Sequence, residues 1–92
     1  MKTFGEYIRK SREEIGLPLR KVAAALDIDT SILSKIERNE RRATIEMIPI
    51  LAKSLDKAEK EIEIHFIESA IMTDLGELSY LKDGLKKILK TL

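Results

Sequence analysis

The chain has no cysteine, few glycines and prolines (4 and 2), and an aromatic content of only 4% over 92 residues. Without cysteine it can form neither a disulfide framework nor a thiolate metal site. The scarcity of glycine and proline leaves helices uninterrupted, and the apolar residues are mainly aliphatic ones at helical spacing. This composition predicts an all-α fold of the size of one domain.

Long apolar runs and a strong charge of one sign are also missing. No run approaches the ~20 residues of a membrane span, and the opening MKTFGE lacks the apolar segment of a signal peptide. We therefore expect a cytoplasmic protein with no membrane partner. The formal net charge is +1, but residues 1–55 carry 11 Lys and Arg against 8 Asp and Glu, while residues 56–92 carry 6 against 8. The positive half is the better candidate for contact with DNA.

The first half of the chain predicts three short helices from its apolar spacing and capping residues. Thr3 and Glu6 have the spacing of a capping box, and Gly16 is suited to end the helix that follows. Pro18 is a favoured first-turn residue and opens the second helix. The third helix is expected over residues 30–38.

The second half predicts three further helices. Thr44 is expected to cap the fourth, and Pro49 is expected to lie far enough inside it to bend it. The fifth helix is expected over residues 58–75 and the sixth over residues 77–92, with Gly76 as the joint between them.

Residues 17–39 have the layout of a helix-turn-helix. Ala23, Ala24 and Ala25 supply small residues where the two helices touch, and Asp27 tolerates the positive φ of the turn. In this motif the second helix enters the major groove of DNA. Its polar outer face would consist of Thr30, Ser31, Ser34, Lys35 and Arg38.

The run LRKVAAALDIDTSILSKIERN, residues 19–39, resembles the helix-turn-helix of the phage-repressor class, called Cro/C1 or XRE. The match is strongest at ILSKIERN and continues into a basic loop and the LAKSL of the fourth helix. It covers roughly residues 3–62 and implies a phage-repressor-like bundle of about five helices. The chain is also similar in size and composition to restriction–modification controller proteins. The family usually has Gln at 19, Gly at 27 and 39, and often Pro at 43, where this chain has Leu19, Asp27, Asn39 and Ala43.

The resemblance implies that Thr30, Ser31 and Lys35 contact bases, and Lys35 can donate to guanine O6 and N7. Ile32 either touches a thymine methyl group or fills the core. The residues expected to contact the DNA backbone or to support the recognition helix are Arg12, Pro18, Ser34, Arg38, Arg41 and Arg42.

A structural ion pair is implied as well, between Arg12 of the first helix and Glu37 at the end of the recognition helix. Such a pair orients the two helices, and Arg12 is left with a possible phosphate contact.

The segment after residue 57 predicts a dimerisation element. The fifth helix has a second apolar face, formed by Ile64, Ile67 and Ile71, which one small core does not need. The sixth helix has apolar residues at the 3, 4, 3, 4 spacing of a coiled-coil seam. The seam residues are Leu78, Leu81, Leu85, Ile88 and Leu92. We expect a DNA-binding unit over residues 1–57 and a helical dimerisation extension over residues 58–92, although the seam can also fold back as core of its own chain.

No residue set supports catalysis, a metal site or a cofactor. His65 is the only histidine, and Glu61 and Glu68 beside it at helical spacing form a solvated face. We expect no enzyme, but a sequence-specific regulator of transcription, a repressor or autoregulator, that binds double-stranded DNA as a homodimer on a palindromic operator. Two alternatives stay open: an antitoxin whose C-terminal helices bind a toxin, and a protein-interaction module without DNA binding. RNA polymerase is a further partner that activation would require.

Overall fold

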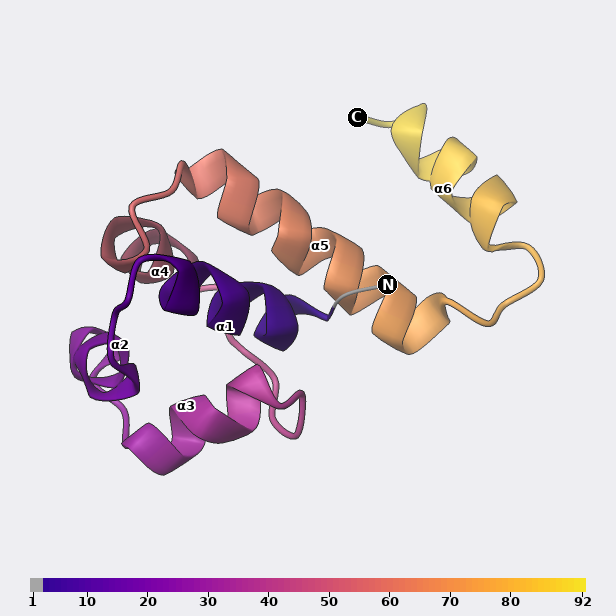
Figure 1. Ribbon diagram of the computed structural model, residues 1–92. Coiled ribbons are helices and arrows are strands. Elements are labelled where there is room, and N and C mark those ends of the chain that lie inside the picture. Colours follow the sequence, from indigo (N-terminus) through magenta and orange to yellow (C-terminus); the bar gives the residue numbers. More distant parts are fainter. Residues whose placement is uncertain (1–2) are drawn as a thin grey trace.

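A computed structural model describes residues 3–92 and contains six helices and no strand in that range, so the predicted all-α class is confirmed. Helices α1 to α5 form a bundle, and α6 stands apart from it beyond a loop (Figure 1). The first two residues of the predicted unit 1–57 lie outside the described range. The helices are α1 (Phe4–Glu14), α2 (Leu19–Leu26), α3 (Thr30–Glu37), α4 (Met47–Ser54), α5 (Glu59–Leu75) and α6 (Leu81–Leu89).

Helices α1 to α5 pack around one apolar core. Helix α1 packs against α3 and α5, α2 against α3 and α4, and α4 against α5. Each large aliphatic side chain buried there contributes about 1.5–3 kcal/mol. Because Ile62 is among them, the bundle extends past residue 57 into the first half of α5. The largest fully buried side chains are Ile8, Val22, Leu33, Leu51, Leu55 and Ile62.

Helices α1 to α4 all end in the same way, with one residue in the left-handed region followed by a reversal of the chain. At the end of α2, for example, the N–H of Asp27 donates to the carbonyl of Ala24 and the N–H of Ile28 to that of Ala23. This is the hydrogen-bond pattern of a Schellman motif, which satisfies carbonyls that the helix leaves unpaired. The four left-handed residues are Gly16 (φ 66°), Asp27 (56°), Asn39 (63°) and Asp56 (54°).

The start of α1 is fixed by three contacts. The N–H of Glu6 donates to Thr3 Oγ1 at 3.1 Å, which is one half of the predicted capping box. The N–H of Phe4 donates to Ser69 Oγ of α5 at 3.0 Å. Gly5 lies so close to the end of α3 that a Cβ there would be 2.8 Å from the carbonyl oxygen of Glu37. Helix α1 is therefore held against both α3 and α5 at its first turn.

The fourth helix begins later than its sequence predicted. Thr44 lies before a turn, and its carbonyl accepts from the N–H of Met47, the first residue of α4. Pro49 consequently falls in the first turn, where its missing N–H costs no hydrogen bond within the helix. The expected bend at Pro49 is wrong, and Ile45, which precedes the helix, is 69% exposed.

The sixth helix is shorter than predicted, at both ends. It begins at Leu81 instead of residue 77 and ends at Leu89. Leu78 lies in the preceding turns, and Leu92 lies beyond the helix and is 94% exposed. The five seam residues therefore do not lie on one continuous helix. Among the helices of residues 3–92, none has both the length and the apolar character needed to cross a membrane.

Candidate nucleic-acid interface

Helices α2 and α3 are joined by the turn that a helix-turn-helix requires. Asp27 takes the left-handed conformation that the sequence predicted, and Asp29 is extended at the N-cap of α3. Ala23 is fully buried. Ala24 and Ala25 are exposed, so the prediction that all three alanines lie between the helices is wrong for these two. One small residue is enough for the contact between α2 and α3, because Ala23 faces the core whereas Ala24 and Ala25 face solvent.

Helix α3 has an anchored side and a free side. Leu33, Ile36 and Glu37 are buried against the bundle. Thr30, Ser31 and Lys35 are exposed, and the helix lies at one edge of the molecule (Figure 1). The structure thus brings the three predicted base-contacting residues onto one accessible surface.

Two further predicted residues flank this surface. Arg38 Nη1 donates to Ser34 Oγ at 3.1 Å, and Arg38 Nε donates to Glu40 Oε2 at 2.8 Å. Both members of the Arg38–Glu40 pair are about half exposed, so the pair adds little stability. Arg38 can therefore leave Glu40 for another anionic partner. Ile32 is half-buried, a position compatible with either of its two expected roles.

The predicted pair of Arg12 and Glu37 is present. Arg12 Nε donates to Glu37 Oε2 at 2.9 Å and Nη2 to Oε1 at 3.1 Å, while Nη1 donates to the carbonyl of Leu17 at 2.9 Å. The hydrogen bonds that Arg12 donates to Glu37, together with the negative charge of Glu37, raise the pKa of Arg12 against the opposing effect of burial. Each of the three guanidinium nitrogens of Arg12 thus donates a hydrogen bond within the protein.

A polar hollow of about 270 Å³ lies between α1, the start of α2, and α3. Arg9 and Arg38 are exposed on its rim, and Pro18 is the exposed N-cap of α2 at the same end of the bundle. Leu19, in place of the family's glutamine, is half-buried against the core. Arg9 was not predicted, because only the packing of α1 across α3 brings it here. The hollow is lined by Arg9, Arg12, Leu19, Ser34, Glu37 and Arg38.

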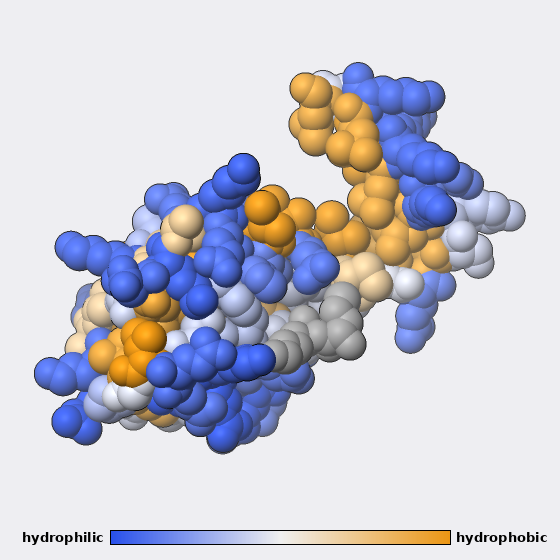
Figure 2. Space-filling view, turned by 45° about the horizontal axis from the view of Figure 1, so that its top comes forward, coloured by the Kyte–Doolittle hydropathy of each residue, from blue (hydrophilic) through white to orange (hydrophobic). Residues whose placement is uncertain are grey.

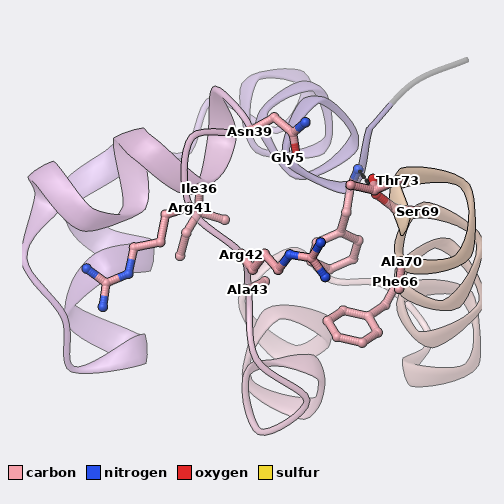
Figure 3. Close-up of a pocket in the computed structure, with 11 residues that line it drawn as sticks. Gly5, Ile36, Asn39, Arg41, Arg42, Ala43, Phe66, Ser69, Ala70 and Thr73 are labelled. Carbon is pink, nitrogen blue, oxygen red and sulfur yellow. Dashed lines mark hydrogen bonds between the residues drawn. The ribbon is translucent and has the colours of Figure 1, made fainter. Parts of the chain in front are cut away.

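The basic loop after α3 holds two arginines that point in opposite directions (Figure 3). Arg41 extends beside α3, and Arg42 extends toward α5. Arg42 pairs with both carboxylate oxygens of Asp74, with Nη1 at 3.0 Å from Oδ2. These bonds raise the pKa of Arg42 and lower that of Asp74. A cavity of about 110 Å³ lies beside the pair, between the loop, α1 and α5.

The predicted dimerisation residues are absent from the buried core of residues 3–92. Ile71, Leu81 and Leu85 are half-buried. The exposed ones are Ile64, Ile67, Leu78, Ile88 and Leu92.

His65 lies in an aromatic contact that sequence spacing did not reveal. Its ring stacks on Tyr7 with the centroids 3.7 Å apart and the planes at 12°. Within residues 3–92 no three His, Asp or Glu side chains are grouped so as to hold a metal ion. His65 therefore packs α5 against α1.

The comparisons with known proteins give one family. The model of a helix-turn-helix family matches residues 8–62, which is more than half of the chain and runs from α1 into α5. No curated protein and no solved structure matches significantly. The match carries no indication of similarity to restriction–modification controllers. Since the matched residues include the whole α2–turn–α3 unit, the chain belongs to the Cro/C1-type (XRE) helix-turn-helix family, a family of DNA-binding and typically non-enzymatic proteins.

Proposed function

We propose that this protein regulates transcription by binding double-stranded DNA sequence-specifically, with α3 in the major groove. The observation that carries the proposal is the free polar face of α3, with Thr30, Ser31 and Lys35 exposed while Leu33 and Ile36 are buried. A groove-reading helix needs this combination, because its base contacts are accurate only if its other side is fixed.

The base contacts are assigned by position on α3. Thr30 and Ser31 lie at the helix N-terminus, the end that recognition helices direct at base edges. Lys35 lies one turn further along and donates to guanine O6 and N7. Ile32 is positioned to meet a thymine methyl group where the site has one.

The backbone contacts surround the hollow beside α3. Arg38 exchanges its exposed pair with Glu40 for a phosphate, and Ser34 donates its hydroxyl beside it. Arg9 and the start of α2 after Pro18 form the opposite rim, and Arg41 extends along α3. These groups fix the register of α3 on DNA without reading its sequence. Arg12 does not belong to this set; it holds the end of α3 in place through its hydrogen bonds to Glu37.

We further propose that the protein acts as a homodimer on a two-fold symmetric operator. One short recognition helix makes few base contacts, and two of them spaced about 34 Å apart read two half-sites. The apolar faces of α5 and α6 that the bundle leaves uncovered supply the interface. Light scattering should give twice the chain mass for the full chain and a monomer for Leu85→Asp. A monomeric wild type would contradict the dimer.

Gel-shift titration with unlabelled competitor DNA tests the DNA-binding proposal. Lys35→Ala should relax the base preference at one position and weaken specific binding by about 1–3 kcal/mol. Lys53→Ala is the matched control, because Lys53 is exposed on α4, outside the α2–turn–α3 unit, and should leave the preference unchanged. No shift at low or moderate salt would refute the proposal and favour a protein-interaction module.

One observation favours a second function, that of an antitoxin. Helix α6 stands apart from the bundle (Figure 1) and none of its apolar residues is buried, as expected of a segment that binds a toxin. Recovery of a stoichiometric toxin from the native host would establish this function, and a neighbouring methyltransferase gene would indicate a restriction–modification controller instead. Repression follows from operator binding over a promoter, whereas activation requires a contact with RNA polymerase.

A further inference from the structure

Arg42 and Asp74 join the basic loop after α3 to the last turn of α5. Both terminal nitrogens of the Arg42 guanidinium donate to the Asp74 carboxylate, one to each oxygen. The two side chains are 67% and 48% exposed, so solvent and salt reach the pair. Such a pair contributes little to the stability of the fold, but it fixes the position of the arginine.

Asp74 occupies a position that its own helix disfavours. Helix α5 ends at Leu75, and its last turn carries no basic residue. The carbonyl groups at a helix C-terminus give that end a partial negative charge, which repels a carboxylate. Arg42 supplies the compensating positive charge, and the hydrogen bonds between the two groups lower the pKa of Asp74 and raise that of Arg42. The carboxylate is therefore stabilised by the loop arginine and not by α5.

The Arg42 side chain points away from the helix that we propose reads DNA. Its neighbour Arg41 extends beside α3, whereas Arg42 extends toward α5 (Figure 3). A cavity of about 110 Å³ lies between this loop, α1 and α5. Because the guanidinium is exposed and stands beside this cavity, the pair with Asp74 holds it there and close packing does not. The two adjacent arginines are thus presented to DNA unequally.

At its other end the pair reaches an uncovered apolar surface. Leu75 follows Asp74 and is 42% exposed, and Leu78 in the next turn is 61% exposed. Figure 2 shows hydrophobic side chains on both walls of the hollow between α5 and α6. The pair therefore connects the loop beside α3 with the surface through which we propose that two copies associate.

We infer that Asp74 restrains DNA binding by holding Arg42 away from the phosphate backbone. This inference rests on the DNA binding of the proposed function and adds a contact that opposes it. A carboxylate that accepts two hydrogen bonds from an arginine occupies the donors that a phosphate would bind. Because phosphate contacts supply affinity without reading sequence, the restraint lowers binding to DNA of any sequence and leaves base discrimination to α3.

Neutralising Asp74 in the full chain tests the restraint. Asp74→Asn keeps the shape of the side chain but removes the charge that holds Arg42. Fluorescence anisotropy with a fixed DNA duplex measures affinity at several salt concentrations. The slope of log affinity against log salt should steepen by about 0.9 for each subunit, the value of one added phosphate contact. Between about 200 and about 50 mM salt, the variant should therefore gain about 3.5-fold more affinity than the wild type for each subunit.

Glu63→Gln is the matched control, because it changes the net charge by the same amount. Glu63 is exposed on the same side of α5, about three turns before Asp74, and forms no ion pair among the described residues. This control should leave the slope unchanged. Arg42→Ala should have little effect alone and should abolish the gain when it is combined with Asp74→Asn. Circular dichroism checks that every variant keeps the wild-type helix content.

The results separate the restraint from DNA binding itself. If Asp74→Asn acts no more strongly than Glu63→Gln, or if its gain persists without Arg42, net charge is responsible and the restraint is overturned. The restraint is also overturned if Arg42→Ala alone lowers the wild-type slope as much as Arg41→Ala does, because Arg42 then already binds a phosphate. A wild type that binds no DNA at low salt would overturn the DNA binding of the proposed function, and the restraint with it.

Discussion

Arg12 and Glu37 form a two-pronged ion pair between the first helix of the bundle and the last turn of α3, with nitrogen–oxygen distances of 2.9 and 3.1 Å. Their side chains are 13% and 5% exposed. The third nitrogen of Arg12 bonds the carbonyl of Leu17, just before α2. A single guanidinium therefore links α1, the residue before α2, and α3 beneath the face that we propose contacts DNA.

Removing one member of this pair should be costly, because the other is left buried and charged. We expect Arg12→Ala to lower the free energy of unfolding by about 3 kcal/mol. Arg9→Ala is the control, because Arg9 pairs with Glu13 in the open, and should cost less than about 0.5 kcal/mol. Urea unfolding followed by circular dichroism measures both. Equal effects would show that the buried pair does not anchor α3.

Gly5 should tolerate no side chain, because the carbonyl of Ile36 occupies the space a Cβ needs. Gly5→Ala should push α1 from the end of α3 and destabilise the fold by about 1–3 kcal/mol. Gly84→Ala is the matched control, since nothing lies within 4 Å of a Cβ there. It should be neutral or stabilising by up to about 1 kcal/mol in a helix. Thermal unfolding of the two variants decides, and a neutral Gly5→Ala would be inconsistent with the close contact.

Arg41 and Arg42 should differ in their contribution to DNA binding. Arg41 extends along α3, whereas Arg42 is neutralised by Asp74 of α5. We expect Arg41→Ala to reduce the slope of log affinity against log salt by about 1 for each subunit, and Arg42→Ala to change it much less. Fluorescence anisotropy with a fixed DNA duplex at several salt concentrations gives both slopes. Equal reductions would mean that Arg42 leaves Asp74 to bind a phosphate.

Tyr7 should titrate later than a free tyrosine. Burial, followed by the negative charge of Glu61, raises the pKa of its phenol above the ordinary value of 10.0. Because the folded state favours the neutral phenol, its stabilising contribution is complete below pH 10 and is lost as pH rises through the raised pKa. Absorbance titration of a Tyr80→Phe variant isolates Tyr7, with the chain unfolded in urea as reference. Coincident curves would disprove the shift.

Local features of the fold were predictable where a residue's own chemistry decides the backbone. Gly16 was expected to end the first helix and Asp27 to tolerate the positive φ of the turn, and both have positive φ. Asp56, which has the same conformation, was missed, because α4 was not expected to end there in a left-handed turn. The bend at Pro49 was wrong because Thr44 looked like a cap, while the helix begins at Met47.

Features that depend on packing or on longer spacing were less predictable. The N–H of Leu78 bonds the carbonyl of Leu75, and the N–H of Leu81 bonds that of Leu78. These bonds form consecutive tight turns that repeat every three residues. The apolar residues of this segment therefore have a spacing like that of a helix, although α6 begins only at Leu81. Arg42 and Asp74 lie 32 residues apart, and no local pattern connects them. The Arg12–Glu37 pair, by contrast, followed from the family resemblance.

The central claim is that α3 reads DNA and that two copies read it together. Enrichment of bound sequences from a random pool of double-stranded DNA tests both parts at once. We expect a pair of inverted half-sites whose centres lie about one helical turn, roughly 34 Å, apart, and a Lys35→Ala selection that loses the preference at one position in each half. A pool that shows no enrichment over repeated rounds would contradict DNA reading by α3, and a single unpaired half-site would contradict the dimer.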